Sequence, residues 1–74
     1  METIHVVQPF DRGKRGLVPC PVLQFKTADE AARRAGLLAD KHAGIVAYSM
    51  DVDEEGGDYS TPRVLFKSGD VPEL

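Results

Sequence analysis

TADEAARRAGLLADKH, residues 27–42, predicts an amphipathic helix around which the rest of the chain is arranged. Thr27 and Glu30 form a capping box, in which the threonine oxygen accepts from the Glu30 amide and the glutamate reaches back. Small apolar residues recur along the stretch at helical spacing and are expected to face a core. This stripe consists of Ala28, Ala31, Ala32, Ala35, Leu38 and Ala39. Gly44, just beyond, suits a helix stop.

The opposite face of this helix is charged, and Leu37 lies in its middle. The pairs Asp29–Arg33 and Glu30–Arg34 place an acid before a base at i,i+4, each stabilising by roughly 0.2–0.5 kcal/mol. A single exposed leucine is common and needs no special explanation. The alternative is that Leu37, surrounded by Arg33 and Arg34, anchors a partner protein or a second copy of the chain.

Length and composition indicate one small folded domain, residues 1–74. A chain this short buries only about 60% of the surface that it exposes when unfolded, so the core is thin. The hydrophobic content of 42% and the mixed charge argue against wholesale disorder. No apolar run approaches the roughly 18 residues of a membrane span, and the N-terminus lacks the features of a signal peptide. We expect no membrane association.

The single cysteine and the net charge indicate the cellular location and the class of partner. Cys20 has no partner for an intramolecular disulfide, which predicts a reducing, cytoplasmic location. A net charge of −3 does not favour nucleic acid as the main partner.

Four strands are predicted around the helix from β-branched content and alternation. They span Thr3–Phe10, a second within Leu17–Lys26 that is best developed from Pro21, Ile45–Val52, and Arg63–Lys67. The resulting β-β-α-β-β order predicts an α+β fold with one helix packed on a four-stranded, mainly antiparallel sheet. We expect the sheet order second, first, third, fourth.

This topology separates charge along the domain. The loop Asp11–Gly16, DRGKRG, is expected at the end of the sheet where the helix finishes, and the acidic turn 51–58 at the opposite end. Both placements complement the helix dipole.

Each charged loop suggests one kind of ligand. In DVDEEGGD, Asp51, Asp53, Glu55 and Gly56 match the start of a calcium loop. Position twelve is Pro62 rather than glutamate, so a solvated hairpin turn is the favoured interpretation, with weak cation binding left open. The other loop carries three cations that could hold phosphate or nucleic acid: Arg12, Lys14 and Arg15. It is a short patch on an acidic protein without tryptophan, so a solvated loop is favoured there too.

Catalytic and metal motifs are weak. Cys20 could form a thiol–imidazole pair with His5 or His42, but nothing in the spacing favours it. Two histidines and one cysteine far apart also fall short of a zinc signature, and no nucleotide or hydrolase motif is present. The sequence therefore assigns no catalytic residue, metal ligand or cofactor, and we expect no enzymatic activity.

The stretch FKTADEA, residues 25–31, resembles the strand-to-helix entry of small α+β domains, including the peptidoglycan-binding SPOR type. The single-helix pattern departs from the two-helix repeat of that domain, so the resemblance implies no function. The leading hypothesis is a small cytoplasmic module that binds protein, either a partner or itself as a homodimer. The alternatives are a phosphate or nucleic-acid binder using Arg12, Lys14 and Arg15, and an accessory or catalytic thiol protein using Cys20.

Overall fold

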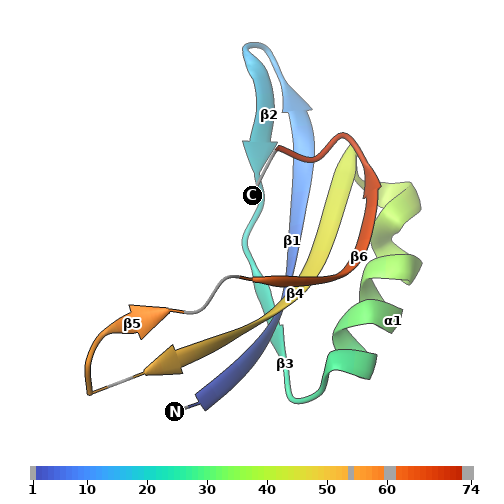
Figure 1. Ribbon diagram of the computed structural model, residues 1–74. Coiled ribbons are helices and arrows are strands. Elements are labelled where there is room, and N and C mark those ends of the chain that lie inside the picture. The colour runs from blue at the N-terminus through green and yellow to red at the C-terminus, as the bar shows by residue number, and fades with distance from the viewer. Residues whose placement is uncertain (1, 54, 60–61, 73–74) are drawn as a thin grey trace.

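The computed structural model describes residues 2–53, 55–59 and 62–72, and it confirms the α+β class (Figure 1). One helix packs against an antiparallel sheet. The elements in chain order are β1 (Glu2–Gly13), β2 (Gly16–Pro19), β3 (Leu23–Phe25), α1 (Ala28–Leu38), the 3₁₀ turn η1 (Ala39–Lys41), β4 (Gly44–Asp53), β5 (Asp58–Tyr59) and β6 (Arg63–Gly69).

The centre of the sheet is the long antiparallel pair of β1 and β4. Its register runs without interruption from Glu2 opposite Val52 to Phe10 opposite Gly44. β3 pairs with the free edge of β1, and β6 pairs with the far edge of β4. The order β3-β1-β4-β6 is the one that the sequence predicts. The short strands β2 and β5 extend the outer ends of β1 and β4.

The predicted second strand is wrong in one respect, because the structure divides it into β2 and β3. The break spans Cys20–Val22 and follows from Pro19 and Pro21, neither of which can donate a hydrogen bond to the sheet. The Cys20 N–H still donates to the Pro9 carbonyl at 3.0 Å, which holds the break against β1.

The predicted loop at residues 11–16 is also shorter than expected. Asp11, Arg12 and Gly13 belong to β1, and Lys14 and Arg15 alone form the tip of a hairpin with β2. Gly16 has φ of 121°, a conformation that favours glycine. The cations therefore lie on a paired hairpin end instead of a loose loop.

Helix α1 begins as predicted and ends earlier. The Glu30 N–H donates to Thr27 Oγ1 at 3.1 Å, which confirms the cap. The regular helix stops at Leu38 and η1 follows, so Gly44 is not a helix cap but the first residue of β4. A Cβ at Gly44 would lie 1.7 Å from the Asp70 carbonyl oxygen, so close backbone approach is what requires glycine there.

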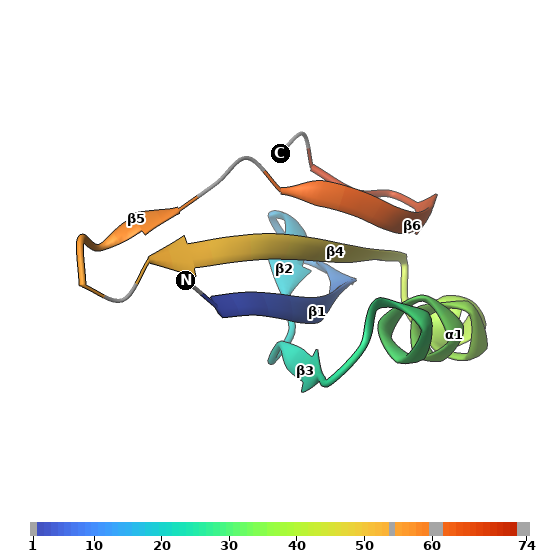
Figure 2. The same ribbon diagram turned by 60° about the horizontal axis from the view of Figure 1, so that its bottom comes forward.

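The core forms where α1 crosses the central strands, and Figure 2 shows the helix beside the β1–β4 pair. Ala31 and Ala35 are fully buried against Val7, Ile45 and Ala47. Larger side chains close the margin of this cluster, namely Phe25, Leu38, Leu65 and Phe66.

The face of the sheet away from this cluster is also covered. Val6, Phe10 and Val46 alternate with the helix-facing residues of their strands and are buried as well. The central pair therefore has buried apolar side chains on both faces.

The charged loops lie at opposite ends, as expected (Figure 1). The hairpin tip with Lys14 and Arg15 is at the end where α1 finishes, since Phe10 pairs with Gly44, which begins β4 shortly after η1. The acidic turn joins β4 to β5 at the other end.

We predict that Thr27→Ala lowers the free energy of unfolding by about 0.5–2 kcal/mol, because it leaves the Glu30 amide without its acceptor. Chemical denaturation would measure this loss. An unchanged denaturation midpoint would contradict a stabilising role for the cap.

Leu38→Ala should destabilise the domain by about 2 kcal/mol, since Leu38 packs against the buried cluster. Leu37→Ala, one residue earlier and 68% exposed, should change stability by no more than about 0.5 kcal/mol at concentrations where the chain is monomeric. Denaturation of the two variants side by side tests which face of α1 packs on the sheet. A larger loss of stability in Leu37→Ala than in Leu38→Ala would contradict this orientation of the helix.

Candidate functional site

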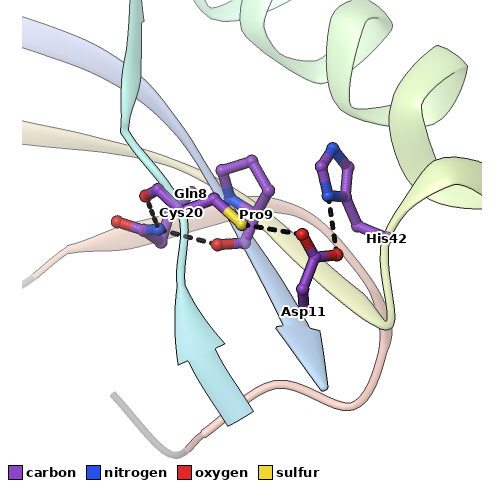
Figure 3. Close-up of polar contacts among 5 residues, drawn as sticks. All are labelled: Gln8, Pro9, Asp11, Cys20 and His42. Carbon is purple, nitrogen blue, oxygen red and sulfur yellow. Dashed lines mark hydrogen bonds and ion pairs between the residues drawn. The ribbon is translucent and has the colours of Figure 1, made fainter. Parts of the chain in front are cut away.

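Three side chains that are distant in sequence meet at the sheet end beside the helix terminus. Asp11 lies in β1, Cys20 follows β2, and His42 follows η1. Figure 3 shows the Asp11 carboxylate between the other two side chains. The Cys20 thiol donates to Asp11 Oδ2 at 3.1 Å, and His42 Nδ1 lies 3.0 Å from Oδ1. An ionised carboxylate only accepts hydrogen bonds, so His42 Nδ1 carries a proton in this arrangement.

The backbone around Cys20 is fixed by Gln8. The Gln8 side-chain amide donates to the Cys20 carbonyl at 2.7 Å and to the Pro9 carbonyl at 2.8 Å (Figure 3). The hairpin register sets Phe10 opposite Pro19, which carries Cys20 back toward β1. The position of the thiol is thus a consequence of strand pairing and one side-chain clamp.

Hydrogen bonding shifts the pKa of both acidic groups in this cluster. The S–H donated to Asp11 raises the pKa of the Cys20 thiol, and burial adds to the shift. The same hydrogen bond, followed by that from His42, lowers the pKa of Asp11. The thiol is therefore protonated at neutral pH. A nucleophilic cysteine needs a neighbouring base or positive charge that favours the thiolate. Here the thiol contacts a carboxylate, which disfavours the thiol-catalysis hypothesis.

Only part of this cluster was foreseen from sequence. The sequence allows a thiol–imidazole pair of Cys20 with His42 without support from their spacing, and nothing in it points to Asp11, which contacts both. His5 lies elsewhere, with Nδ1 2.7 Å from Ser49 Oγ on the helix-facing side of the sheet. The usable signal was the short GKRG turn, since a tight hairpin there brings Cys20 back beside the end of the first strand.

The acidic turn does not assemble a calcium site within the residues described, which leave out residue 54. Asp53 Oδ1 accepts from the N–H groups of Glu55 and Gly56 at 3.1 and 3.2 Å, as in a solvated turn. Asp51 accepts from the Thr3 hydroxyl at 2.6 Å and from Arg63, and these contacts lower its pKa. Among the described residues, no three ligand atoms converge in this turn.

The three cations of the hairpin are not equivalent. Arg12 forms an ion pair with Asp70, which follows β6, whereas Lys14 and Arg15 are exposed at the tip. Arg12 and Asp70 line a hollow of about 630 Å³ between the hairpin and residues 69–72. An anionic ligand of Arg12 would have to compete with the Asp70 carboxylate, so this geometry does not favour the phosphate-binding hypothesis.

The outer face of α1 presents the exposed Leu37 as predicted, 68% accessible. Beside it is a hollow of about 380 Å³, and its lining comprises Phe25, Glu30, Arg33, Arg34 and Leu37. Phe25 contributes an apolar wall from β3, and Leu23 of the same strand is 40% exposed. The sequence did not predict that the end of β3 borders this face.

Comparison with known proteins adds no family: no family model, curated protein or solved structure matches this chain. Within residues 2–53, 55–59 and 62–72, no helix is long and apolar enough to cross a membrane.

We predict that Asp11→Asn increases the rate of Cys20 alkylation by iodoacetamide at about pH 8, where an ordinary thiol is partly ionised. The carboxylate keeps the wild-type thiol protonated until the pH rises through its raised pKa, and the neutral amide does not. Mass spectrometry follows the reaction, with Asp51→Asn as a control that removes a carboxylate elsewhere. Equal rates in wild type and Asp11→Asn would show that Asp11 does not hold the thiol proton.

Proposed function

We propose that this domain is a non-enzymatic protein-interaction module of the reducing cytoplasm, and that it associates with a second copy of itself through the outer face of α1. The observation that carries the proposal is Leu37, a large apolar side chain 68% exposed on a charged helix face. The hollow that it shares with Phe25 gives an incoming apolar side chain a place to pack.

The order of charges along α1 supports a second copy as the occupant. Asp29 and Glu30 lie in the first turn, and Arg33 and Arg34 lie one turn later. A two-fold axis between these turns, with the helices antiparallel, places each acidic pair against the basic pair of the other copy. The same operation brings Leu37 to the start of the second helix, where Phe25 borders the hollow.

We predict that the wild-type chain forms a dimer and that Leu37→Asp abolishes it without unfolding the domain. A charge at the centre of an apolar contact loses its hydration without gaining a partner. Sedimentation equilibrium over a concentration series measures association, and circular dichroism verifies the fold. Val18→Asp is the matched control, because Val18 is 51% exposed but lies on β2, away from the helix face.

Charge reversal tests the orientation of the two copies. Arg33→Glu with Arg34→Glu makes the whole contact acidic and should weaken the dimer at least about tenfold at low salt. The effect should shrink at about 0.5 M salt, because screening shortens the range of repulsion. A wild-type chain that stays monomeric at high concentration refutes self-association. A dimer that survives Leu37→Asp places the interface elsewhere, such as the exposed edge of β3 or β6.

A further inference from the structure

We propose that Asp11, Cys20 and His42 bind one Zn²⁺ ion through carboxylate oxygen, thiolate sulfur and imidazole nitrogen, and leave its fourth position open to an exchangeable ligand. The proposal is independent of the helix-mediated dimer, since none of the three residues lies in α1.

The spacing of the donor atoms fits a tetrahedral ion. One ligand atom from each residue lies within 4.8 Å of the other two. Cys20 Sγ lies 3.1 Å from Asp11 Oδ2, and His42 Nδ1 lies 3.0 Å from the other carboxylate oxygen, Oδ1. Zinc bonds of about 2.0–2.3 Å at tetrahedral angles separate neighbouring ligands by about 3.4–3.6 Å. Rotations of the three side chains would therefore bring one carboxylate oxygen, the sulfur and the ring nitrogen to these separations around an ion.

The donor set selects the class of metal. Calcium and magnesium prefer oxygen ligands, so neither ion suits the thiolate sulfur and the imidazole nitrogen of this cluster. Zinc accepts all three types, and sites with three protein ligands usually keep a fourth position for water or substrate. On binding, the S–H bond of Cys20 breaks, its proton leaves to solvent, and the electron pair forms the zinc–sulfur bond. At His42 the Nδ1–H bond also breaks, its proton leaves to solvent, and the freed Nδ1 lone pair binds the ion, while the neutral ring carries a proton on Nε2.

The cluster is open to solvent, and hydrogen bonds hold the backbone of Cys20 in place. The side chains of Asp11 and His42 are 52% and 22% exposed, so an ion can reach them from solvent. Gln8 holds the Cys20 carbonyl, and the Cys20 amide is held by Pro9, so the sulfur approaches from a fixed backbone. Such outer contacts orient metal ligands and typically alter affinity by about 10–100-fold when removed.

Isothermal titration calorimetry of the tag-free, reduced chain with zinc chloride tests the site. We expect one ion per chain and a higher melting temperature with zinc, because an ion that binds only the folded state stabilises it. Cobalt substitution should give a sulfur-to-cobalt absorption band and intense tetrahedral bands in the visible region. Zinc should also protect Cys20 of the wild-type chain from alkylation, a readout that needs no variant.

Variants distinguish zinc binding at this cluster from nonspecific zinc binding elsewhere on the surface. Cys20→Ser and His42→Gln should each weaken zinc binding by at least about 100-fold, more than the loss of an outer contact. Gln8→Ala should weaken it by about tenfold. His5→Gln, which changes the histidine outside the cluster, should leave it unchanged. Binding of equal strength in Cys20→Ser, or a ratio of one ion to two chains, would overturn the proposal. Alkylation of wild-type Cys20 at the same rate with and without zinc would also overturn it.

Discussion

The structure depends on the packing of two alanines against the central strand pair. Ala31 and Ala35 are fully buried on Val7, Ile45 and Ala47, which lets the helix lie close to the sheet. A short chain has a thin core, so close packing matters more here than in a larger domain. This contact positions the helix axis on the central strands.

That contact fixes the end of the molecule where the polar cluster lies. Once α1 is seated, the chain turns within a few residues to enter β4, and glycine at position 44 lets the first residue of that strand lie directly against the Asp70 backbone. His42 lies in this turn. The β1–β2 hairpin brings Asp11 and Cys20 to the same place from the other side, through strand register. The cluster thus results from three constraints that act at one end of the sheet: the position of α1, the turn that leads into β4, and the register of the β1–β2 hairpin.

The arrangement of charge decides which chemistry the cluster can perform. A carboxylate between a thiol and an imidazole holds the thiol proton and raises the thiol pKa, which disfavours nucleophilic attack. The same three groups are suitable ligands for an ion that displaces that proton.

The sequence by itself determined the local features of this protein: the helix, its Thr27 cap, the alanine stripe, the exposed Leu37 and the order of the four main strands. These follow from periodicity and from contacts between near neighbours, which the sequence displays directly. Pro19 and Pro21 suit a strand entry as well as an interruption, so the sequence alone predicts one strand where the structure has two, β2 and β3. Only the tertiary structure decided the ion pair of Arg12 with Asp70, the role of Gly44, and the meeting of Asp11, Cys20 and His42. Each of these depends on where a hairpin, a helix end and a strand end lie in space, and residues far apart in sequence carry no periodic signal of that proximity.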